Sequence, residues 1–361
     1  MSDLSTGAAD RAERMAWWHD AKFGMFVHWG CYSVLGRGEQ ILLRDSMPFE
    51  EYRTIADDFK PAPDWADQIA DQAVRAGAKY VVLTTRHHDG YCLFDTETDP
   101  FNGVNTGPGR DLIAEYVEAV RKRGLKIGFY YSVINWRWKS FWAPDELPAL
   151  VNEIHDQMRE LLTNYGKIDI LWYDIPKVPG DTTPGSFGFT PQPVAESVPD
   201  FYRIVELNGM ARELQPHILI NNRSGLPEDF GTPEQHITPE AGNRAWESCM
   251  TINYAPNWAN IPYSIADKTA GQILFNMIEA VRLGGNFLFN IGPDGQGHVA
   301  DRDREALDRI GKMSNSRWKI SGLPAAPPDD LAPVIKIEFE DAPYQLSFSD
   351  AKWLDGEYEA E

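Results

Sequence analysis

The sequence predicts an α/β fold in which eight parallel strands and their connecting helices close into a barrel. Apolar segments that end in polar residues recur along the 361 residues, and amphipathic segments with helical spacing separate them. One apolar segment, Ile168–Asp174, has the composition of a strand buried on both faces, yet it ends in a carboxylate. A doubly wound open sheet is the alternative, but no G-x-G-x-x-G follows the first strand and no Walker A motif occurs.

The expected elements follow one another in the order that a barrel needs. Strands are expected at Phe23–Gly30, Lys79–Arg86, Leu125–Ser132, Ile168–Asp174, Ile218–Arg223, Glu234–Ile237, Glu247–Asn253 and Asn286–Ile291. Helices are expected at Asp64–Ala76, Arg110–Arg123, Leu147–Tyr165, Asp200–Leu214 and Ser264–Leu283. A glycine follows four of these helices, as is typical of helix C-termini. Residues 31–61 are expected to be a loop and a polar segment, and residues 177–199 a long irregular loop.

Beyond residue 322 the composition changes to a linker followed by a hairpin pattern. Val334–Glu340 and Tyr344–Ser349 alternate with period two around a turn. A two-stranded hairpin is not stable alone. We therefore expect residues 1–322 to form the barrel and residues 323–361 to form a linker and a small hairpin extension that packs on it.

Composition narrows the class of partner. The chain carries 34 basic and 54 acidic residues, a formal charge of −20, which argues against nucleic acid and anionic membranes. Cys31, Cys92 and Cys249 are widely spaced, as expected for reduced core thiols. No secretory signal and no apolar run of about 18 to 20 residues occurs, so a native start at Met1 predicts a cytoplasmic protein. Self-association is left open.

Polar and aromatic side chains gather at the ends of the expected strands. They are His28, His87, His88, Tyr130, Trp172, Asp174 and Arg223, with Glu39, Glu234 and Glu247 on neighbouring loops or short strands. Taken alone, Asp174 is equally a residue that begins a turn. The C-terminal ends of parallel strands meet on one face of a barrel, however, so the set together predicts a polar pocket.

Carboxylate chemistry suits this set of residues best. Zinc is disfavoured because adjacent His87 and His88 would point to opposite sides of an extended chain, and no H-E-x-x-H occurs. The G-x-S-x-G turn of serine hydrolases is also missing. Two carboxyl groups in a pocket of His, Tyr, Trp and Arg fit glycoside hydrolysis, with no metal or other cofactor expected.

Eight segments in order resemble the conserved blocks of the family 29 α-L-fucosidases. They are Phe23–Gly30, Arg86–Tyr91, Gly128–Ser132, Leu171–Asp174, Asn222–Arg223, Thr232–Glu234, Trp246–Asn253 and Gly284–Gly295. The resemblance covers roughly residues 15–315. It implies an irregular (β/α)8 barrel that releases terminal α-L-fucose, with retention of configuration, from fucosylated oligosaccharides or glycoconjugates.

The resemblance also implies roles for single residues. Asp174 matches the nucleophile and Glu234 the acid/base, with Glu247 beside Trp246 as the alternative acid/base. The matching sugar-pocket residues are His28, Glu39, His87, His88, Tyr130, Trp172 and Arg223. Trp258 is given the remaining stacking role provisionally.

Three departures from the family pattern keep other functions open. Gln40 stands where the family usually has Trp, and Ile175 where it usually has Gly. The large C-terminal β-sandwich of many members is absent or reduced to the hairpin. A fucose-binding barrel with weakened turnover, or a retaining glycosidase for a related sugar such as L-galactose, are the alternatives.

Overall fold

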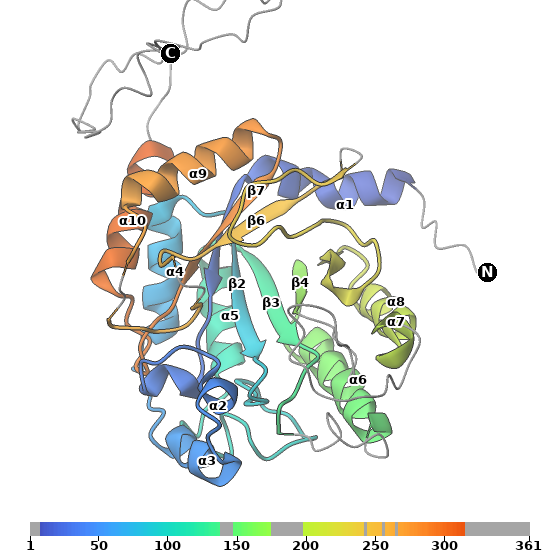
Figure 1. The fold of residues 1–361 in the computed structure, drawn as a ribbon. Coiled ribbons are helices and arrows are strands. Elements are labelled where there is room, and N and C mark those ends of the chain that lie inside the picture. Colours follow the sequence, from blue (N-terminus) through green and yellow to red (C-terminus); the bar gives the residue numbers. More distant parts are fainter. Residues whose placement is uncertain are drawn as a thin grey trace, which may run out of the picture. The chain divides into compact units, whose positions relative to one another are not determined.

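The computed structural model describes residues 8–137, 147–174, 198–241, 244–254, 257–263 and 266–314. Within these ranges, one seven-stranded parallel sheet has the order β5-β4-β3-β2-β1-β7-β6. Its strands are β1 (Phe23–Val27), β2 (Tyr80–Arg86), β3 (Lys126–Ser132), β4 (Ile170–Asp174), β5 (Leu219–Ile220), β6 (Glu247–Met250) and β7 (Asn286–Ile291). The predicted α/β class is confirmed, and Figure 1 shows the sheet at the centre with helices around it.

An irregular segment, residues 229–235, joins the two edge strands of the sheet. On one side it hydrogen-bonds to β5 and the residues after it, through Asp229 N to Ile220 O and Asn222 N to Phe230 O, both 2.9 Å. On the other side Glu247 N donates to Gly231 O at 2.9 Å, which pairs the segment with β6. The segment therefore occupies the eighth position of an irregular barrel. The regular strand expected at Glu234–Ile237 is wrong, because Pro233 has no N–H to donate and Gln235 turns to a φ of 62°.

Ten α-helices lie in the described ranges. They are α1 (Ala8–Ala21), α2 (Ile41–Arg44), α3 (Phe49–Asp57), α4 (Trp65–Ala76), α5 (Leu112–Lys122), α6 (Leu147–Asn164), α7 (Val198–Phe201), α8 (Ile204–Leu214), α9 (Ala270–Arg282) and α10 (Asp301–Ser314). Local sequence explains several of the ends: Asp111 accepts from Ala114 N and starts α5, and Gly77 with a φ of 78° ends α4.

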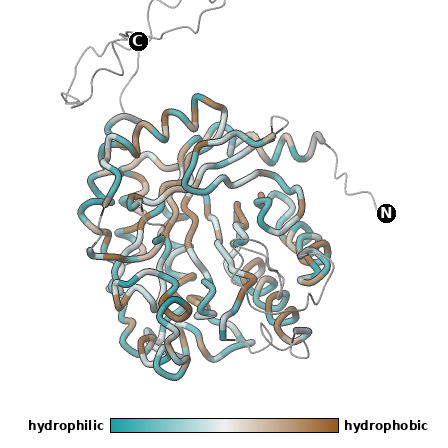
Figure 2. Tube along the Cα trace, viewed as in Figure 1, coloured by the Kyte–Doolittle hydropathy of each residue, from teal (hydrophilic) through white to brown (hydrophobic). Residues whose placement is uncertain are grey.

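The strands separate two apolar cores. In β1, Met25 and Val27 pack against the surrounding helices, whereas Phe26 between them points into the barrel. The inner core consists of Met15, Trp18, Ala21, Phe26, Tyr80, Val82, Tyr130, Ile170, Trp172, Leu219, Phe230, Cys249, Trp258 and Leu288. In Figure 2 hydrophobic residues run along the central strands, while hydrophobic and hydrophilic residues alternate around the helices.

Helix α1 closes the end of the barrel at which the strands begin. Its Trp18 ring lies 4.9 Å from that of Phe230, and the Trp18 carbonyl accepts from Asn286 Nδ2 at 2.8 Å. Arg14 of the same helix pairs with the buried Asp229 at 3.1 Å. In Figure 1 the arrowheads of β2 and β3 point away from α1, towards α2 and α3. The face with the C-terminal strand ends is therefore the one that remains for a site.

Several elements differ from the sequence-based expectation. Helices α2 and α3 lie in the stretch that was expected to be loop and polar segment. The expected helix Asp200–Leu214 is divided into α7 and α8, because Arg203 adopts a φ of 50°. Helix α9 begins at Ala270 rather than Ser264, since Thr269 and Gln272 form a capping box there.

The described residues leave two expectations untested. The hairpin at residues 334–349 and the boundary near residue 322 lie outside the described ranges and stay predictions. The three cysteines are free and buried, as expected. Among the helices of the described ranges, none is long and apolar enough to cross a membrane.

Candidate active site

Asp174 is the last residue of β4, and three side chains of the site contact its carboxylate. Its Oδ2 accepts from the Tyr130 hydroxyl at 2.6 Å, and its Oδ1 accepts from Arg223 at 2.9 Å. His88 Nε2 lies 3.5 Å from Oδ2. Burial favours the neutral acid, but Arg223, His88 and Tyr130 outweigh it and hold the pKa of Asp174 below its usual value. Asp174 is therefore an ionised carboxylate in a buried site.

Arg223 holds Asp174 and Glu234 together. One guanidinium nitrogen contacts Asp174 at 2.9 Å, and another contacts Glu234 Oε2 at 2.7 Å. The guanidinium also lies 4.7 Å above the Trp172 ring, and its Nε donates to Thr232 Oγ1 at 2.9 Å. Since a planar guanidinium fixes the directions of its N–H groups, the two carboxyl groups share one defined site.

Arg223 comes from an element that the sequence pattern did not show. Strand β5 is only two residues long, and Arg223 lies in the 3-10 turn Asn222–Ser224 that follows it. The expectation that Arg223 ends a strand is therefore wrong in detail. The turn nevertheless brings Arg223 to the C-terminal end of β4.

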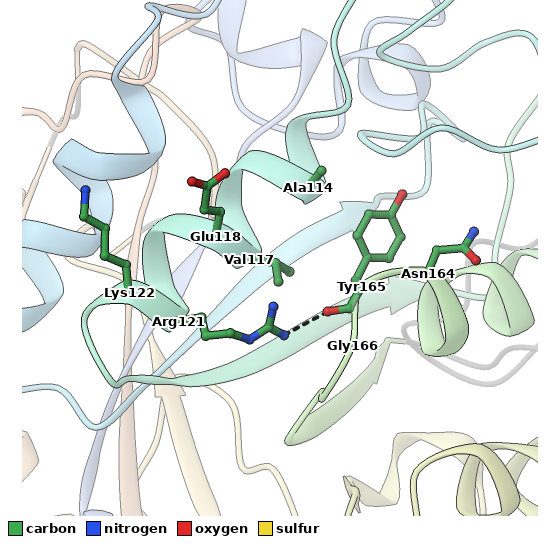
Figure 3. Close-up of a pocket in the computed structure, with 8 residues that line it drawn as sticks. All are labelled: Ala114, Val117, Glu118, Arg121, Lys122, Asn164, Tyr165 and Gly166. Atoms are coloured by element: carbon green, nitrogen blue, oxygen red, sulfur yellow. Dashed lines mark hydrogen bonds between the residues drawn. The ribbon is translucent and has the colours of Figure 1, made fainter.

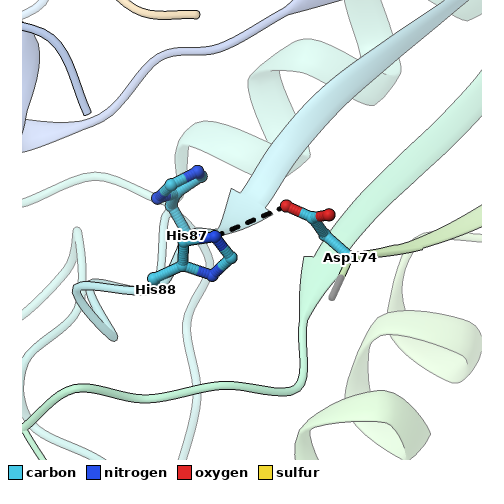
Figure 4. A group of neighbouring side chains, drawn as sticks. All are labelled: His87, His88 and Asp174. Carbon is cyan, nitrogen blue, oxygen red and sulfur yellow. Dashed lines mark ion pairs between the residues drawn. The ribbon is translucent and has the colours of Figure 1, made fainter. Parts of the chain in front are cut away.

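The two consecutive histidines lie side by side. Their ring centroids are 4.2 Å apart, and Gly90 N donates to the His87 carbonyl at 3.0 Å, so the chain turns directly after β2. The expectation that they point to opposite sides is wrong, because it assumed an extended chain. Figure 4 shows His88 facing the Asp174 carboxylate with His87 next to it.

The hydrogen bonds of His88 define its tautomer. Burial lowers the pKa of His88 to about 4, although Asp174 opposes this, so the ring is neutral near pH 7. Nδ1 lies 2.6 Å from Ser132 Oγ, and Nε2 faces Asp174. A neutral ring can face a carboxylate favourably only with its N–H, so Nε2 carries the proton and Nδ1 is an acceptor. The Ser132 hydroxyl lies 2.6 Å from Nδ1 and 3.0 Å from the Ile134 carbonyl, and with this tautomer it donates to the closer Nδ1.

His87, His88 and Asp174 have the spacing of a metal site. Their ligand atoms lie within 4.8 Å of one another. Asp174, however, already accepts from Tyr130 and Arg223, and a bound cation would lie beside the Arg223 guanidinium. Charge repulsion therefore disfavours a metal in this cluster.

His28, at the end of β1, presents a nitrogen lone pair to the site. Asn290 Nδ2 donates to the Trp258 carbonyl at 2.6 Å, which leaves its Oδ1 to accept from His28 Nδ1, also at 2.6 Å. Burial lowers the pKa of His28 to about 3, so the ring is neutral and Nε2 is an acceptor. The Trp258 ring lies 5.0 Å from that of His28.

Glu39 fixes the loop that carries Trp258. Its Oε2 accepts from the backbone N–H groups of Trp258 and Ala259 at 2.9 and 3.0 Å. Its Oε1 is buried and has no partner among the described residues. Glu39 therefore holds the Trp258 loop with one carboxylate oxygen, while its other oxygen is a buried acceptor with no hydrogen bond to the described residues.

Trp172 and Glu247 lie beneath the two paired carboxylates. The Trp172 ring stacks on that of Tyr130 at 5.8 Å, and its indole N–H donates to Glu247 at 3.3 Å. Glu247 also accepts from the Tyr80 hydroxyl and is completely buried. Burial raises the pKa of Glu247 to about 7. The structure thus brings Glu234 to Arg223 and Asp174, and places Glu247 in the barrel core.

Two of the three departures from the family pattern are single residues, and one of these two lies in the described ranges. Gln40 is half-buried and immediately precedes α2, and Ile175 lies outside the described residues. A separate surface hollow of about 570 Å³ lies between α5 and the C-terminal end of α6. Figure 3 shows it beside Arg121, whose guanidinium donates to the Tyr165 carbonyl at 2.8 Å. None of the predicted site residues lines it.

Three residues of the site were missed by sequence reasoning. Ser132 and Asn290 set the tautomers of His88 and His28, and Thr232 orients Arg223. Ser132 and Asn290 are polar residues near the C-terminal ends of apolar strands. The strand-end position that indicates the charged and aromatic residues of the site therefore indicates these two as well.

Comparison with known proteins agrees with this geometry. The α-L-fucosidase family model matches residues 4–316. The α-L-fucosidase of Dictyostelium discoideum is 28% identical, across 85% of this chain and 73% of its own length. The tissue α-L-fucosidase of Homo sapiens is 27% identical, across 82% of this chain and 66% of its own length.

Solved structures give the same result. α-L-Fucosidase isoenzyme 1 from Paenibacillus thiaminolyticus superposes with a TM-score of 0.73 at 34% identity, covering 84% of this chain and 76% of that one. Unliganded α-L-fucosidase AlfC from Lactobacillus casei superposes with a TM-score of 0.70 at 28% identity, covering 84% and 98%. Fold and site together define a barrel glycoside hydrolase with paired carboxylates. The chain belongs to the α-L-fucosidase family.

Proposed function

We propose that this chain is a retaining exo-α-L-fucosidase in which Asp174 is the nucleophile and Glu234 the acid/base. The observation that carries the proposal is the single Arg223 guanidinium that contacts both carboxylates. In retaining glycosidases the two carboxyl groups lie only about 5 to 5.5 Å apart, and one guanidinium can contact both only when they are close. The substrates would be fucosylated oligosaccharides or glycoconjugates.

The first step needs an ionised nucleophile and a protonated acid. Asp174 attacks the anomeric carbon while the bond to the leaving oxygen breaks and Glu234 gives that oxygen its proton. Asp174 suits the attack because Arg223 and the Tyr130 hydroxyl keep it ionised despite burial. The Glu234 side chain is 37% exposed, so it can take up the required proton from solvent.

The second step reverses the roles. Glu234, now a carboxylate, removes a proton from water, the hydroxyl oxygen attacks the anomeric carbon, and the bond to Asp174 breaks. Two inversions give net retention. The Arg223 contact at 2.7 Å holds the end of the Glu234 side chain in place for this step.

The surrounding residues suit a neutral sugar. His28 presents its Nε2 acceptor to a sugar hydroxyl, whereas His88 turns its Nε2–H to Asp174 and orients that carboxylate. The Trp258 ring supplies an aromatic surface for an apolar sugar face. Because burial keeps both histidines neutral, they add no charge to the site.

The geometry supports Glu234 over Glu247 as the acid/base. Glu247 is completely buried, and both of its oxygens are engaged, by Tyr80 and by Trp172. A group in that position has no path to the leaving oxygen. The pairing of Asp174 with Glu234 also supports turnover rather than sugar binding alone.

Substitution of the two glutamates tests the assignment. General acid catalysis is worth about 10² to 10⁴ in rate, mainly for poor leaving groups. Glu234→Ala should therefore lower kcat/KM for a fucosyl disaccharide by about that factor and spare a nitrophenyl fucoside. Glu247→Ala should lower kcat/KM for both substrates by the same factor. Collapse of the disaccharide-to-aryl ratio in Glu247→Ala alone would exchange the two roles.

The substrate class needs a separate comparison. The same assay with aryl L-galactosides separates the fucosidase proposal from the L-galactosidase alternative, since the two sugars differ by one hydroxyl at C6. Higher kcat/KM on the galactoside would overturn the proposal.

The cytoplasmic location, and the exclusion of nucleic-acid and membrane partners, stay predictions from the sequence.

A further inference from the structure

Glu234 lies at a bend of the backbone that is unusual for a residue with a side chain. Gln235, directly after it, has a φ of 62°, in the left-handed region that residues other than glycine rarely adopt. Such a conformation persists only where surrounding contacts enforce it. The contacts around Gln235 therefore determine how the chain leaves Glu234.

The backbone on both sides of Glu234 is bound to one residue of β6. Cys249 N donates to the Pro233 carbonyl at 3.0 Å, and Gln235 N donates to the Cys249 carbonyl at 2.9 Å. Glu234 itself pairs with Cys249 in a parallel bridge. Partners in such a bridge share one side of the sheet, so Glu234 projects to the same side as Cys249, whose thiol lies 3.9 Å from Arg223.

The side-chain amide of Gln235 adds a second anchor. Its Nε2 donates to Thr251 Oγ1 at 2.9 Å, and its Oε1 lies 3.5 Å from Lys268 Nζ. Lys268 in turn donates to the carbonyls of Thr251 and Asn253, both at 2.9 Å. Gln235, Thr251 and Lys268, here called the Gln235 cluster, thus join the bend to the end of β6 and to the residues before α9.

None of the contacts of the Gln235 cluster involves Asp174 or Arg223. Its members bind one another and the backbone of residues 251–253, beyond the end of β6. Thr251 is almost completely buried, and Lys268 is half-buried. The cluster can therefore act on catalysis only through the position of the bend, and so of the Glu234 side chain.

We propose that the Gln235 cluster positions Glu234 for proton transfer to the leaving oxygen and from water. This inference rests on the proposed role of Glu234. The Arg223 contact alone fixes the end of the side chain in the substrate-free site. During the first step the protonated carboxyl must turn to the leaving oxygen, and its reach then depends on a backbone that the cluster holds in place. A displacement of about 1 Å can cost 10²-fold in rate.

Two substitutions separate positioning from general loosening of the fold. Gln235→Gly removes the amide while glycine adopts a positive φ without strain, so the backbone itself is not penalised. Thr251→Val removes the hydroxyl that the amide binds, whereas Thr251→Ser keeps that hydroxyl and loses only the methyl group. Gln272→Ala is the matched control for loosening of the neighbouring chain. Its amide binds Thr269 and the hydroxyl of Tyr254, whose ring lies 5.0 Å from Lys268 Nζ, but it binds no member of the cluster itself.

The readout is the ratio of kcat/KM on a fucosyl disaccharide to kcat/KM on a nitrophenyl fucoside. Gln235→Gly and Thr251→Val should each lower this ratio by at least about tenfold. This loss should be smaller than the factor of about 10² to 10⁴ expected for complete loss of the acid. Thr251→Ser should recover it, and Gln272→Ala should leave it within about twofold. Azide should also speed steady-state turnover of the aryl substrate in the two variants with the lowered ratio, since an anion needs no base.

Equal losses on both substrates, or an unchanged ratio, would overturn the proposal. Gln235→Asn gives the same test if Gln235→Gly does not melt cooperatively, because asparagine tolerates the left-handed conformation and its side chain is one methylene too short for the 2.9 Å contact with Thr251. Glu234→Ala in the same assay separates the two levels of inference. If Glu234→Ala lowers the ratio and the cluster variants do not, only the positioning role of the cluster fails. If Glu234→Ala leaves the ratio unchanged, the assignment of Glu234 as the acid/base fails.

Discussion

Two buried carboxyl groups inside the barrel, Asp174 and Glu247, have opposite electrostatic surroundings. Asp174, at the C-terminal end of β4, faces Arg223, and its pKa is lowered despite burial. Glu247, at the start of β6, faces only the neutral Tyr80 and Trp172, and burial raises its pKa to about 7. Both accept good hydrogen bonds, so the charge of the donor separates them.

This difference separates chemistry from structure within one core. An ionised carboxylate buried next to a cation suits the proposed role of nucleophile, whereas a buried carboxyl that faces only neutral hydrogen-bond donors suits a structural role. Trp172 contacts the surroundings of both groups: the Arg223 guanidinium lies over its ring, and its indole N–H donates to Glu247. The predictions below change one side of this comparison at a time.

Removal of the Asp174 carboxylate should have the largest effect. Asp174→Gly should lower kcat on an aryl fucoside by at least about 10³-fold, because the proposed mechanism forms the covalent intermediate on this carboxylate. Added azide should restore part of the rate and yield β-fucosyl azide, since a small anion fits the space of the lost side chain. Residual kcat above about a tenth of the wild-type value would disprove the role of Asp174.

Removal of the cation should make Asp174 resemble Glu247. Without Arg223 the buried Asp174 carboxylate has no charged partner, so its pKa should rise and the acidic limb of kcat/KM should move to higher pH. Arg223→Met should also lower kcat/KM at neutral pH by about 10²-fold, as when one charge-stabilising donor is lost.

The pH profile separates charge from geometry at this position. Arg223→Lys keeps the charge but cannot contact both carboxylates in the same way. It should therefore lose activity with little movement of the acidic limb. An acidic limb in Arg223→Met that coincides with the wild-type limb would show that Arg223 does not control the ionisation of Asp174.

Replacement of Glu247 by its neutral isostere should have the smallest effect on activity. The folded protein holds the Glu247 proton to a pKa of about 7, against 4.5 as the ordinary value. The stability that this proton contributes is present at low pH and is lost as the pH rises from about 4.5 to 7. The loss is on the order of 3 kcal/mol.

Glu247→Gln should abolish this pH dependence, because the amide resembles the protonated acid. Relative to wild type, the variant should gain free energy of unfolding between pH 5 and pH 8, measured by denaturant titration at both values. Its disaccharide-to-aryl ratio should stay within about twofold of wild type. A constant stability difference between the two pH values would show that Glu247 is ionised in the fold.

Strong local patterns predicted most of the barrel. The glycine-stopped helices and the apolar strands at Tyr80–Arg86, Lys126–Ser132 and Asn286–Ile291 follow from periodicity and composition. The eighth position did not, because residues 229–235 are held by pairing on both sides and carry no strand pattern of their own. Helix α1 was missed because only Met15, Trp18 and Ala21 are apolar on its inner face, and its role depends on a barrel end far away in sequence.

The members of the site were easier to predict than their arrangement. Strand ends and family motifs identified Asp174, Glu234 and Arg223, and the structure brings them into contact. The side-by-side placement of His87 and His88 depends on a turn directly after β2, which the assumption of an extended chain excluded. Long-range hydrogen bonds such as Asn290 to His28, 262 residues apart, leave no local trace in the sequence.

Covalent trapping tests the central claim most directly. A 2-fluoro-fucosyl fluoride forms the glycosyl-enzyme with a good leaving group and then hydrolyses slowly, so the intermediate accumulates. Peptide mass spectrometry of the trapped protein should place one 2-fluoro-fucosyl group on Asp174, and Asp174→Asn should carry none. A label on Glu234 or Glu247, or turnover of the reagent with no covalent adduct at any residue, would contradict the double-displacement account.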